Sequence, residues 1–287
     1  MTFVVARKFD QRILIATDTM TSSNPKRPRP EPLPGVLKAV VIDLHTSVSF
    51  AGSADLAHRY IRDAKRLYSE RKSLPHLLDL LSEASKDYCV DFIVASHRPQ
   101  AVLHVIKKGQ VSADIDGCWI GDSDGFKMMP SLPVQKDIQI DPTFGTWEEA
   151  QFTREFLQMF EPGMTDLSIT IGGFAIFLLG SPNGHTYMSR SVIYHGGEIT
   201  LTPQGFVPEQ MRARAEVQAG FAYDVVAPNE RGVAVLGVLF PQPAFGYVYS
   251  PIEWDEPQKV SAIAKADFID LIGEKARALG GSFVPNA

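Results

Sequence analysis

Three polar side chains near the start of the chain have the types and spacing needed to hydrolyse an amide bond. Thr2 follows the first methionine, Asp18 stands sixteen residues after Thr2, and Lys38 stands twenty residues after Asp18. Aminopeptidases remove a first methionine that precedes a small side chain, which would leave Thr2 with a hydroxyl nucleophile and a free α-amine. That amine, with a pKa of about 7.7–8.0, can serve as general base for the hydroxyl of its own residue. A buried lysine nearby would lower the pKa of both groups, and an aspartate would hold that lysine in place.

Two predicted β-hairpins would bring these three residues together. Residues 2–18 and 38–52 each contain two runs rich in Val and Ile with a short polar break between them. This is the pattern of paired, buried strands. Thr2 opens the first strand, Asp18 closes the second and Lys38 opens the third. If the hairpins lie side by side, the three side chains converge at one end of a sheet.

The N-terminal half of the chain resembles a proteasome β-type subunit or one of the bacterial proteasome-like subunits. In that family an acidic residue stands sixteen residues after the mature threonine, as Asp18 does after Thr2. The family lysine precedes the glycine of an Ala-Gly strand end by fourteen residues, as Lys38 precedes Gly52. The resemblance, which extends more weakly to about residue 190, implies an α+β fold: the four-layer αββα sandwich of the N-terminal nucleophile (Ntn) hydrolases.

The resemblance also implies groups that would stabilise an oxyanion and orient the threonine. Backbone N–H groups near Gly52 would face the developing negative charge. A Gly-Ser-Gly turn of the family falls at Gly121, where the glycine fits. Asp122 stands at the position of the serine, however, and Ser123 comes one residue later.

A second pair of family residues is matched less well. The family has an Asp and a Ser that help to orient the threonine, placed just before a Gly-Gly pair. Here Asp166, Ser168 and Thr170 stand nearby, and Ser168 is the candidate positioning residue, but Ile171 occupies the position of the family serine. This departure weakens the prediction of a fully equipped peptidase.

Three interpretations of the function remain open at this point. The favoured one is a threonine-type hydrolase that cleaves a peptide or amide bond and, by resemblance, assembles as a homo-oligomer such as a ring, with an unfoldase partner left unknown. A non-catalytic structural subunit with the same fold is the second. The third is an Ntn amidohydrolase for small substrates. Taken singly, each candidate residue also has an ordinary structural role, since Thr favours strands and Asp favours turns.

The composition is that of a globular chain with room for a sizeable core. Of 287 residues, 45% are hydrophobic and 21% charged, as in ordinary folded domains. The formal net charge of −5 and the lack of a basic stripe argue against nucleic acid as a partner. No run of about 18 apolar residues and no signal-peptide pattern occur, so we expect a cytoplasmic protein with no membrane association.

No cofactor or metal site is predicted. Cys89 and Cys118 are far apart and lack C-x-x-C spacing, which argues against a disulfide framework or a zinc site. His97 and His104 fall in predicted strands or turns, with no carboxylate or cysteine at metal-ligand spacing. Both histidines are therefore weak candidates for chemistry.

The rest of the chain predicts the remaining layers of the fold. Residues 54–72 and 73–88 have the periodicity of amphipathic helices that could cover one face of a sheet. Thr146 and Glu149 form a capping-box pattern at the start of a third helix. Further strands are expected at residues 91–96, 101–106, 111–119, 170–180 and 185–193.

Two regions follow from this pattern. Residues 1–200 are predicted to form the proteasome-like Ntn-hydrolase core. Residues 201–287 are predicted to form a C-terminal extension with extra strands and an amphipathic helix over residues 262–279, packed on the core.

Overall fold

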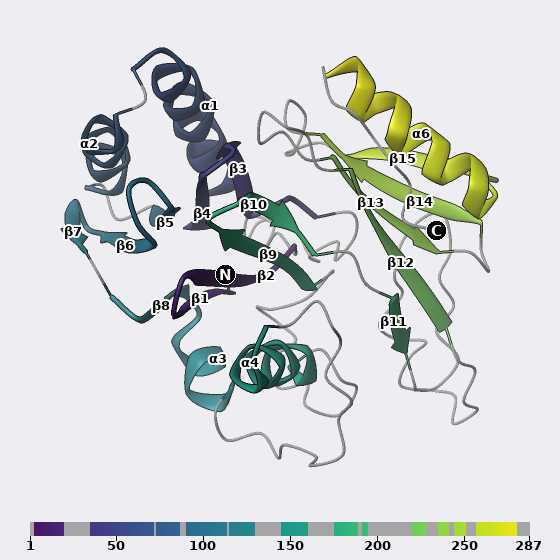
Figure 1. Cartoon of the computed structure of the whole chain (residues 1–287), viewed down its shortest axis with the longest axis horizontal. Helices are drawn as coiled ribbons and strands as arrows, with labels where there is room; N and C mark the ends of the chain where they lie inside the picture. The colour runs from purple at the N-terminus through teal and green to yellow at the C-terminus, as the bar shows by residue number, and fades with distance from the viewer. Residues whose placement is uncertain are drawn as a thin grey trace, which may run out of the picture.

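The computed structural model describes residues 3–19, 35–71, 73–86, 90–113, 115–129, 145–159, 175–188, 191–194, 220–227, 235–240, 244–250 and 257–279. These residues form an α+β structure with five helices and three five-stranded antiparallel sheets (Figure 1). Within these ranges, no helix is both long enough and apolar enough to cross a membrane.

The first sheet contains the first predicted hairpin. Its strand order is β10-β9-β2-β1-β8, and its strands are β1 (Phe3–Phe9), β2 (Arg12–Asp18), β8 (Gly117–Gly121), β9 (Ala175–Ser181) and β10 (Gly184–Tyr187). Alternate residues of β1 enter two different cores: Val4 packs in the largest apolar cluster, whereas Val5 packs in a second cluster on the other face. Because both faces of this sheet are covered, its strands are continuous apolar runs rather than alternating ones.

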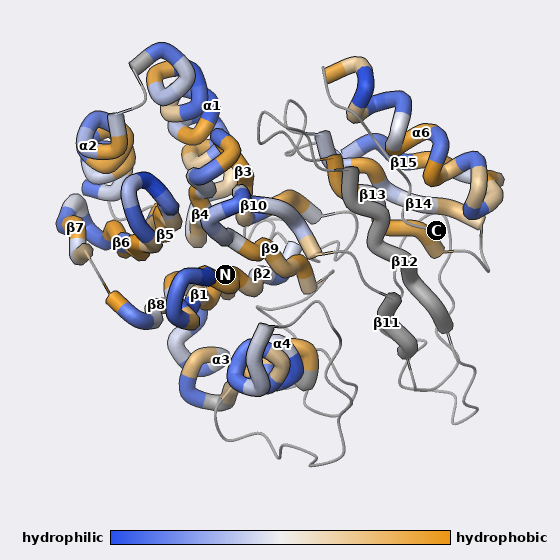
Figure 2. Tube along the Cα trace, viewed as in Figure 1, coloured by the Kyte–Doolittle hydropathy of each residue, from blue (hydrophilic) through white to orange (hydrophobic). Residues whose placement is uncertain are grey.

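The second sheet contains the second predicted hairpin. Its strands, in spatial order, are β3 (Ala39–Asp43), β4 (Thr46–Gly52), β5 (Val90–Ser96), β6 (Val102–Lys107) and β7 (Gln110–Ser112). Helices α1 (Ala54–Arg71) and α2 (Leu74–Ser85) pack on one face of it, as predicted. Along these helices polar and apolar residues alternate in colour in Figure 2, as expected of helices with one buried side.

The single strand predicted over residues 111–119 is wrong. The chain instead leaves the second sheet after β7 and enters the first sheet as β8, which pairs with β1. Polar residues separate β7 from β8, among them Asp116, the residue directly before β8. A chain that crosses between two packed sheets must interrupt its strand pairing, and this interruption is what the apolar pattern alone did not show.

The two N-terminal sheets pack face to face, and two helices lie on the outer face of the first. β1, β8 and β10 of the first sheet contact β4 and other strands of the second. On the opposite side, α3 (Ser123–Met128) packs against β1, and α4 (Trp147–Gln158) packs against β2 and β9. Phe156 of α4 stacks on Phe3 with ring centroids 5.6 Å apart.

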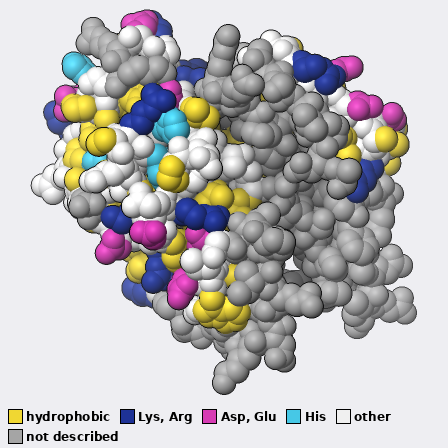
Figure 3. Space-filling view, in the orientation of Figure 1, with side chains coloured by type: hydrophobic (Ala, Val, Ile, Leu, Met, Phe, Trp, Pro, Cys, Tyr) yellow, Lys and Arg dark blue, Asp and Glu magenta, His cyan; other side chains and the backbone are white. Residues whose placement is uncertain are grey.

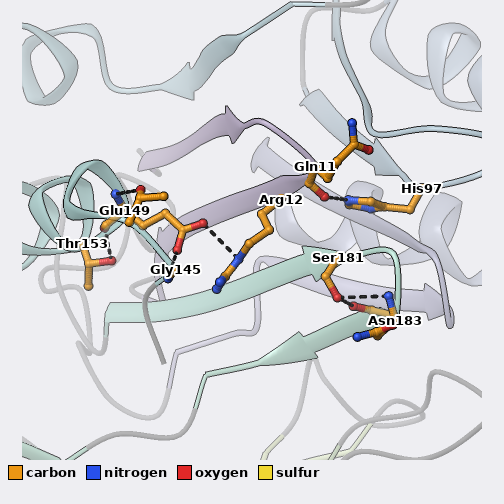
Figure 4. Close-up of polar contacts among 10 residues, drawn as sticks. Gln11, Arg12, His97, Gly145, Glu149, Thr153, Ser181 and Asn183 are labelled. Carbon is orange, nitrogen blue, oxygen red and sulfur yellow. Dashed lines mark hydrogen bonds and ion pairs between the residues drawn. The ribbon is translucent and has the colours of Figure 1, made fainter. Parts of the chain in front are cut away.

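The start of α4 confirms half of the predicted capping box. The Thr146 hydroxyl accepts a hydrogen bond from the Glu149 backbone N–H at 3.3 Å. The Glu149 carboxylate turns instead to the Gly145 N–H, at 2.6 Å, and to Arg12 Nε of β2, at 3.0 Å (Figure 4). This carboxylate is 1% exposed, so the pair fastens α4 to the first sheet through a largely buried contact.

The C-terminal strands form the third sheet, with α6 on one face. The spatial order is β11 (Ser191–Tyr194), β12 (Gly220–Ala227), β13 (Val235–Phe240), β14 (Phe245–Tyr249) and β15 (Gln258–Ser261). Helix α6 (Lys265–Ala278) packs on β12 and β13. Because β11 belongs to this sheet, the C-terminal unit begins before residue 201, within the region that the sequence assigned to the core.

Both faces of β13 and β14 are buried. Leu236 and Tyr247 lie in the same apolar cluster as the N-terminal sheets, so the extension packs on the core. On the other face the Phe268 ring of α6 lies over two glycines of neighbouring strands. A Cβ atom added at Gly237 would come within 2.7 Å of that ring, and one added at Gly246 within 2.6 Å.

Basic and acidic side chains of the described residues are interspersed on the face shown in Figure 3. Helix α6 carries Asp267 in its first turn and Lys275 and Arg277 in its last. These charges complement the helix dipole.

Candidate functional site

A buried ion pair joins the ends of the two N-terminal hairpins. Lys38 Nζ lies 2.7 Å from Asp18 Oδ1, and the two side chains are 1% and 0% exposed. Asp18 closes β2 of the first sheet, and Lys38 immediately precedes β3 of the second, so the pair bridges the two sheets. Burial lowers the pKa of Lys38 below its usual value, although the charge and hydrogen bond of Asp18 oppose that shift. The sequence prediction that these two residues converge is supported by this geometry.

The same carboxylate oxygen also holds the start of the first strand. Asp18 Oδ1 accepts a hydrogen bond from the Phe3 backbone N–H at 3.0 Å. Thr2, the predicted nucleophile, lies outside the described residues. It directly precedes Phe3 in the sequence. The Asp18–Lys38 pair therefore lies at the backbone N–H of the residue that follows Thr2.

Hydrogen bonds fix the backbone on both sides of Lys38, although Lys38 itself lies just outside β3. Gly35 has φ +63°, and a Cβ there would come within 2.1 Å of the Thr19 carbonyl oxygen. This close approach allows the Val36 N–H to donate to that oxygen at 2.8 Å. The Lys38 carbonyl accepts from the Phe50 N–H of β4 at 3.0 Å. Sequence reasoning missed Gly35, although the Pro-Gly pair before the strand is a usable turn signal.

The two glycines predicted near the oxyanion lie at the same end of the sheets. Gly52 ends β4, two residues beyond the Phe50 N–H that bonds Lys38, and has φ 114°. Gly121 ends β8 directly across from Phe3 in the strand register and has φ 93°. Backbone in this left-handed region favours glycine.

The other predicted positioning residues divide into two cases. Asp122 is buried and caps α3: its Oδ1 accepts from the backbone N–H groups of Asp124, at 2.9 Å, and Gly125, at 3.1 Å. Ser123 is the first, exposed residue of the same helix. Ser168 lies outside the described residues, as do its neighbours from 160 to 174.

A second buried polar cluster, unpredicted from the sequence, lies at the far end of the same sheets. We call it the histidine relay: Ser47, His185, His97 and the Gln11 carbonyl. His185 Nδ1 lies 3.0 Å from Ser47 Oγ, and His185 Nε2 lies 2.8 Å from His97 Nδ1. His97 Nε2 lies 3.1 Å from the Gln11 carbonyl oxygen (Figure 4). Gln11 is in the β1–β2 turn, so the relay is separated from Phe3 by the seven residues of β1, or about 20 Å.

The carbonyl at one end fixes the direction of the relay. A carbonyl only accepts, so His97 Nε2 carries a hydrogen and donates to Gln11. In the neutral pair, His185 Nε2 then donates to His97 Nδ1, and the Ser47 hydroxyl donates to His185 Nδ1. Burial lowers the pKa of His97, and lowers that of His185 to about 3, which favours this neutral form. The relay is thus a polar link between the two sheets.

The described residues contain no group of three or more His, Cys, Asp or Glu side chains arranged to hold a metal ion. In comparisons with known proteins, no family model matches the chain and no curated protein matches it significantly. A functional assignment therefore depends on the geometry around Asp18 and Lys38.

Proposed function

We propose that the chain is an N-terminal threonine hydrolase that cleaves a peptide or amide bond. The observation that carries this proposal is the double role of Asp18, whose Oδ1 accepts from Lys38 Nζ at 2.7 Å and from the Phe3 N–H at 3.0 Å. A buried ammonium is thereby held beside the residue that follows Thr2. A buried ion pair adds little net stability to a fold, whereas ionisable groups with perturbed pKa values are common at functional sites. Both points favour a functional role for the Asp18–Lys38 pair.

The packing of the N-terminal elements supports the Ntn-hydrolase fold as part of the proposal. Helices α1 and α2, the second sheet, the first sheet, and helices α3 and α4 succeed one another as packed layers (Figure 1). This succession is consistent with a four-layer αββα sandwich of proteasome-like topology. The proposal includes a cytoplasmic homo-oligomer, such as a ring, acting on a peptide or amide substrate.

The proposed reaction begins when Thr2 Oγ attacks the substrate carbonyl carbon. Its proton passes to the Thr2 α-amine, directly or through a water, while the positive charge of Lys38 favours the ionised hydroxyl. Backbone N–H groups near Gly52 stabilise the oxyanion. The carbon–nitrogen bond then breaks, and the protonated amine gives its proton to the leaving nitrogen. Water attacks the resulting ester, which frees the acid product and restores the Thr2 hydroxyl.

Intact-mass analysis of the protein from its natural host tests the first requirement. A mass without Met1, followed by one covalent adduct of a threonine-directed electrophile located on Thr2, is the expected result. Retention of Met1 would leave Thr2 without a free amine and would rule out the enzyme. In that case the non-catalytic structural subunit, which the capping role of Asp122 favours, would be the better assignment.

A further inference from the structure

Helix α1 places one buried imidazole against the segment that carries Lys38. His58 is 3% exposed and forms a hydrogen bond with the Leu37 backbone. Its ring also meets the Phe50 ring edge to face, with centroids 5.0 Å apart and an interplanar angle of 82°. Leu37 precedes Lys38 in the chain, and the Phe50 N–H bonds the Lys38 carbonyl. His58 therefore contacts the residue that precedes Lys38 and the residue of β4 that bonds the Lys38 carbonyl.

Each of the three residues leading into β3 is held by a different part of the fold. The Val36 N–H donates to Thr19 after β2, the Leu37 backbone bonds His58 of α1, and the Lys38 carbonyl accepts from Phe50 of β4. The bond between Phe50 and Lys38 continues the β3–β4 pairing by one residue. Before it, the backbone is held by the Thr19 and His58 contacts, so the Leu37 contact constrains the residue next to Lys38.

The His58 ring is neutral near pH 7. Burial, aided by the positive charge of Arg62, lowers the pKa of His58 to about 4. Its ring N–H can then serve as a neutral donor to the Leu37 carbonyl.

We infer that His58 is a positioning residue for the proposed hydrolysis: by holding the Leu37 carbonyl, it directs Lys38 toward Asp18 and the terminal amine. This inference rests on the proposed function for its consequence in catalysis. The positioning of Lys38 itself can be measured independently of any activity.

The test compares a donor-free variant with a donor-retaining one. His58→Leu removes the N–H at similar volume, His58→Met is a second donor-free variant, and His58→Gln keeps an amide donor. Tyr68→Phe is the matched control, because Tyr68 lies on the same helix, is buried, and accepts a hydrogen bond from Thr46 Oγ1 at the other end of β4. The readouts are the pKa of the Lys38 ammonium by NMR and the rate at which the electrophile modifies Thr2.

We expect His58→Leu and His58→Met to raise the Lys38 pKa, because a loosened segment admits water. Modification of Thr2 should slow by about tenfold to a hundredfold, the usual effect of a misplaced catalytic group. His58→Gln should restore both values in part, and Tyr68→Phe should leave both unchanged.

An unchanged Lys38 pKa and modification rate in both donor-free variants would overturn the inference, as would changes of equal size in Tyr68→Phe. Failure of the proposed function gives a different result. If wild-type Thr2 is never modified but the donor-free variants alone shift the Lys38 pKa, the positioning role holds and the hydrolase proposal fails.

Discussion

His97 and His185, which are 88 residues apart in the sequence, share a hydrogen bond of 2.8 Å between Nδ1 and Nε2. Their rings stand nearly perpendicular, at 83°, with centroids 4.9 Å apart. His97 follows β5 of the second sheet and His185 lies on β10 of the first. This contact, with its extensions to Gln11 and Ser47, closes the end of the two sheets opposite Lys38.

The first prediction concerns acid. The pKa of both relay histidines is lowered in the folded state, so the unfolded chain binds more protons below its ordinary pKa of about 6.5. The stability that the neutral rings contribute is complete above that pH and is lost as the pH falls toward about 3, the folded pKa of His185. Urea unfolding between pH 7.5 and 4.5 should show a decreasing free energy of unfolding.

The free energy of unfolding should depend less steeply on pH in His185→Gln, because this variant lacks one titrating ring. His76→Gln, at an exposed histidine of α2, should retain the wild-type slope. Equal slopes in wild type and His185→Gln would contradict the assignment of the acid sensitivity to the relay. His97, His45 and His58, whose pKa values are also lowered, contribute to the slope that remains in His185→Gln.

The second prediction concerns Gly180, which allows the two rings to meet. A Cβ at this position would lie 2.9 Å from His185 Nε2 and 2.9 Å from His97 Cε1. Gly180→Ala should therefore destabilise the protein by about 1–3 kcal/mol through overpacking, as measured by urea unfolding at pH 7.5. Gly117→Ala is the control, because its Cβ would approach no heavy atom closer than 3.6 Å. Equal stabilities of the two variants would show that the rings adjust freely.

The third prediction separates stability from activity at the Asp18–Lys38 pair. Lys38→Met leaves the Asp18 carboxylate buried without its ammonium partner and should cost about 3–5 kcal/mol of unfolding free energy. Adding Asp18→Asn removes the stranded charge but keeps an oxygen for the Phe3 N–H, so the double variant should recover much of that loss. Neither variant should form the Thr2 adduct at the wild-type rate.

An exposed pair provides the comparison. Lys86 and Glu83 form an ion pair at the C-terminal end of α2, with side chains 57% and 64% exposed. Lys86→Met should change the free energy of unfolding by less than about 1 kcal/mol. A double variant at Asp18 and Lys38 that regained wild-type Thr2 reactivity would show that the ion pair serves the fold alone.

The fourth prediction concerns the packing of α6 on the third sheet. Gly246→Ala should clash with the Phe268 ring and with the Val238 carbonyl oxygen, 2.9 Å from the added carbon. It should loosen the third sheet, giving faster amide hydrogen exchange in β13 and β14 than in β1 and β2. Phe268→Leu should reduce the penalty of Gly246→Ala, a coupling that a double-mutant cycle measures. Additive effects would mean that the ring is not the obstacle.

Both hairpins and the convergence of Asp18 with Lys38 could be predicted, because they depend on local features. Runs of Val and Ile mark buried strands, and a short polar break fixes each hairpin. Once two hairpins pack side by side, residues at the ends of their strands must meet. The capping role of Thr146 was also predictable, since an N-cap is decided within one helical turn.

Contacts that depend on packing between distant segments could not be predicted in this way. A lone His58 on the apolar side of a helix, or His185 in a short strand, has no local signature of its partner. The exchange of sheets between β7 and β8 was missed for the same reason: residues 111–119 read as a single strand, and only the tertiary fold decides which neighbours each part pairs with.

The bond from the Phe3 N–H to Asp18 bears on the proposed hydrolase. The donor is a main-chain group, and β1 is paired with β2 from Val4 to Phe9, so neither contact uses a side chain of Met1 or Thr2. Under the proposed function, removal of Met1 would therefore create a basic amine next to a strand that these backbone bonds already hold.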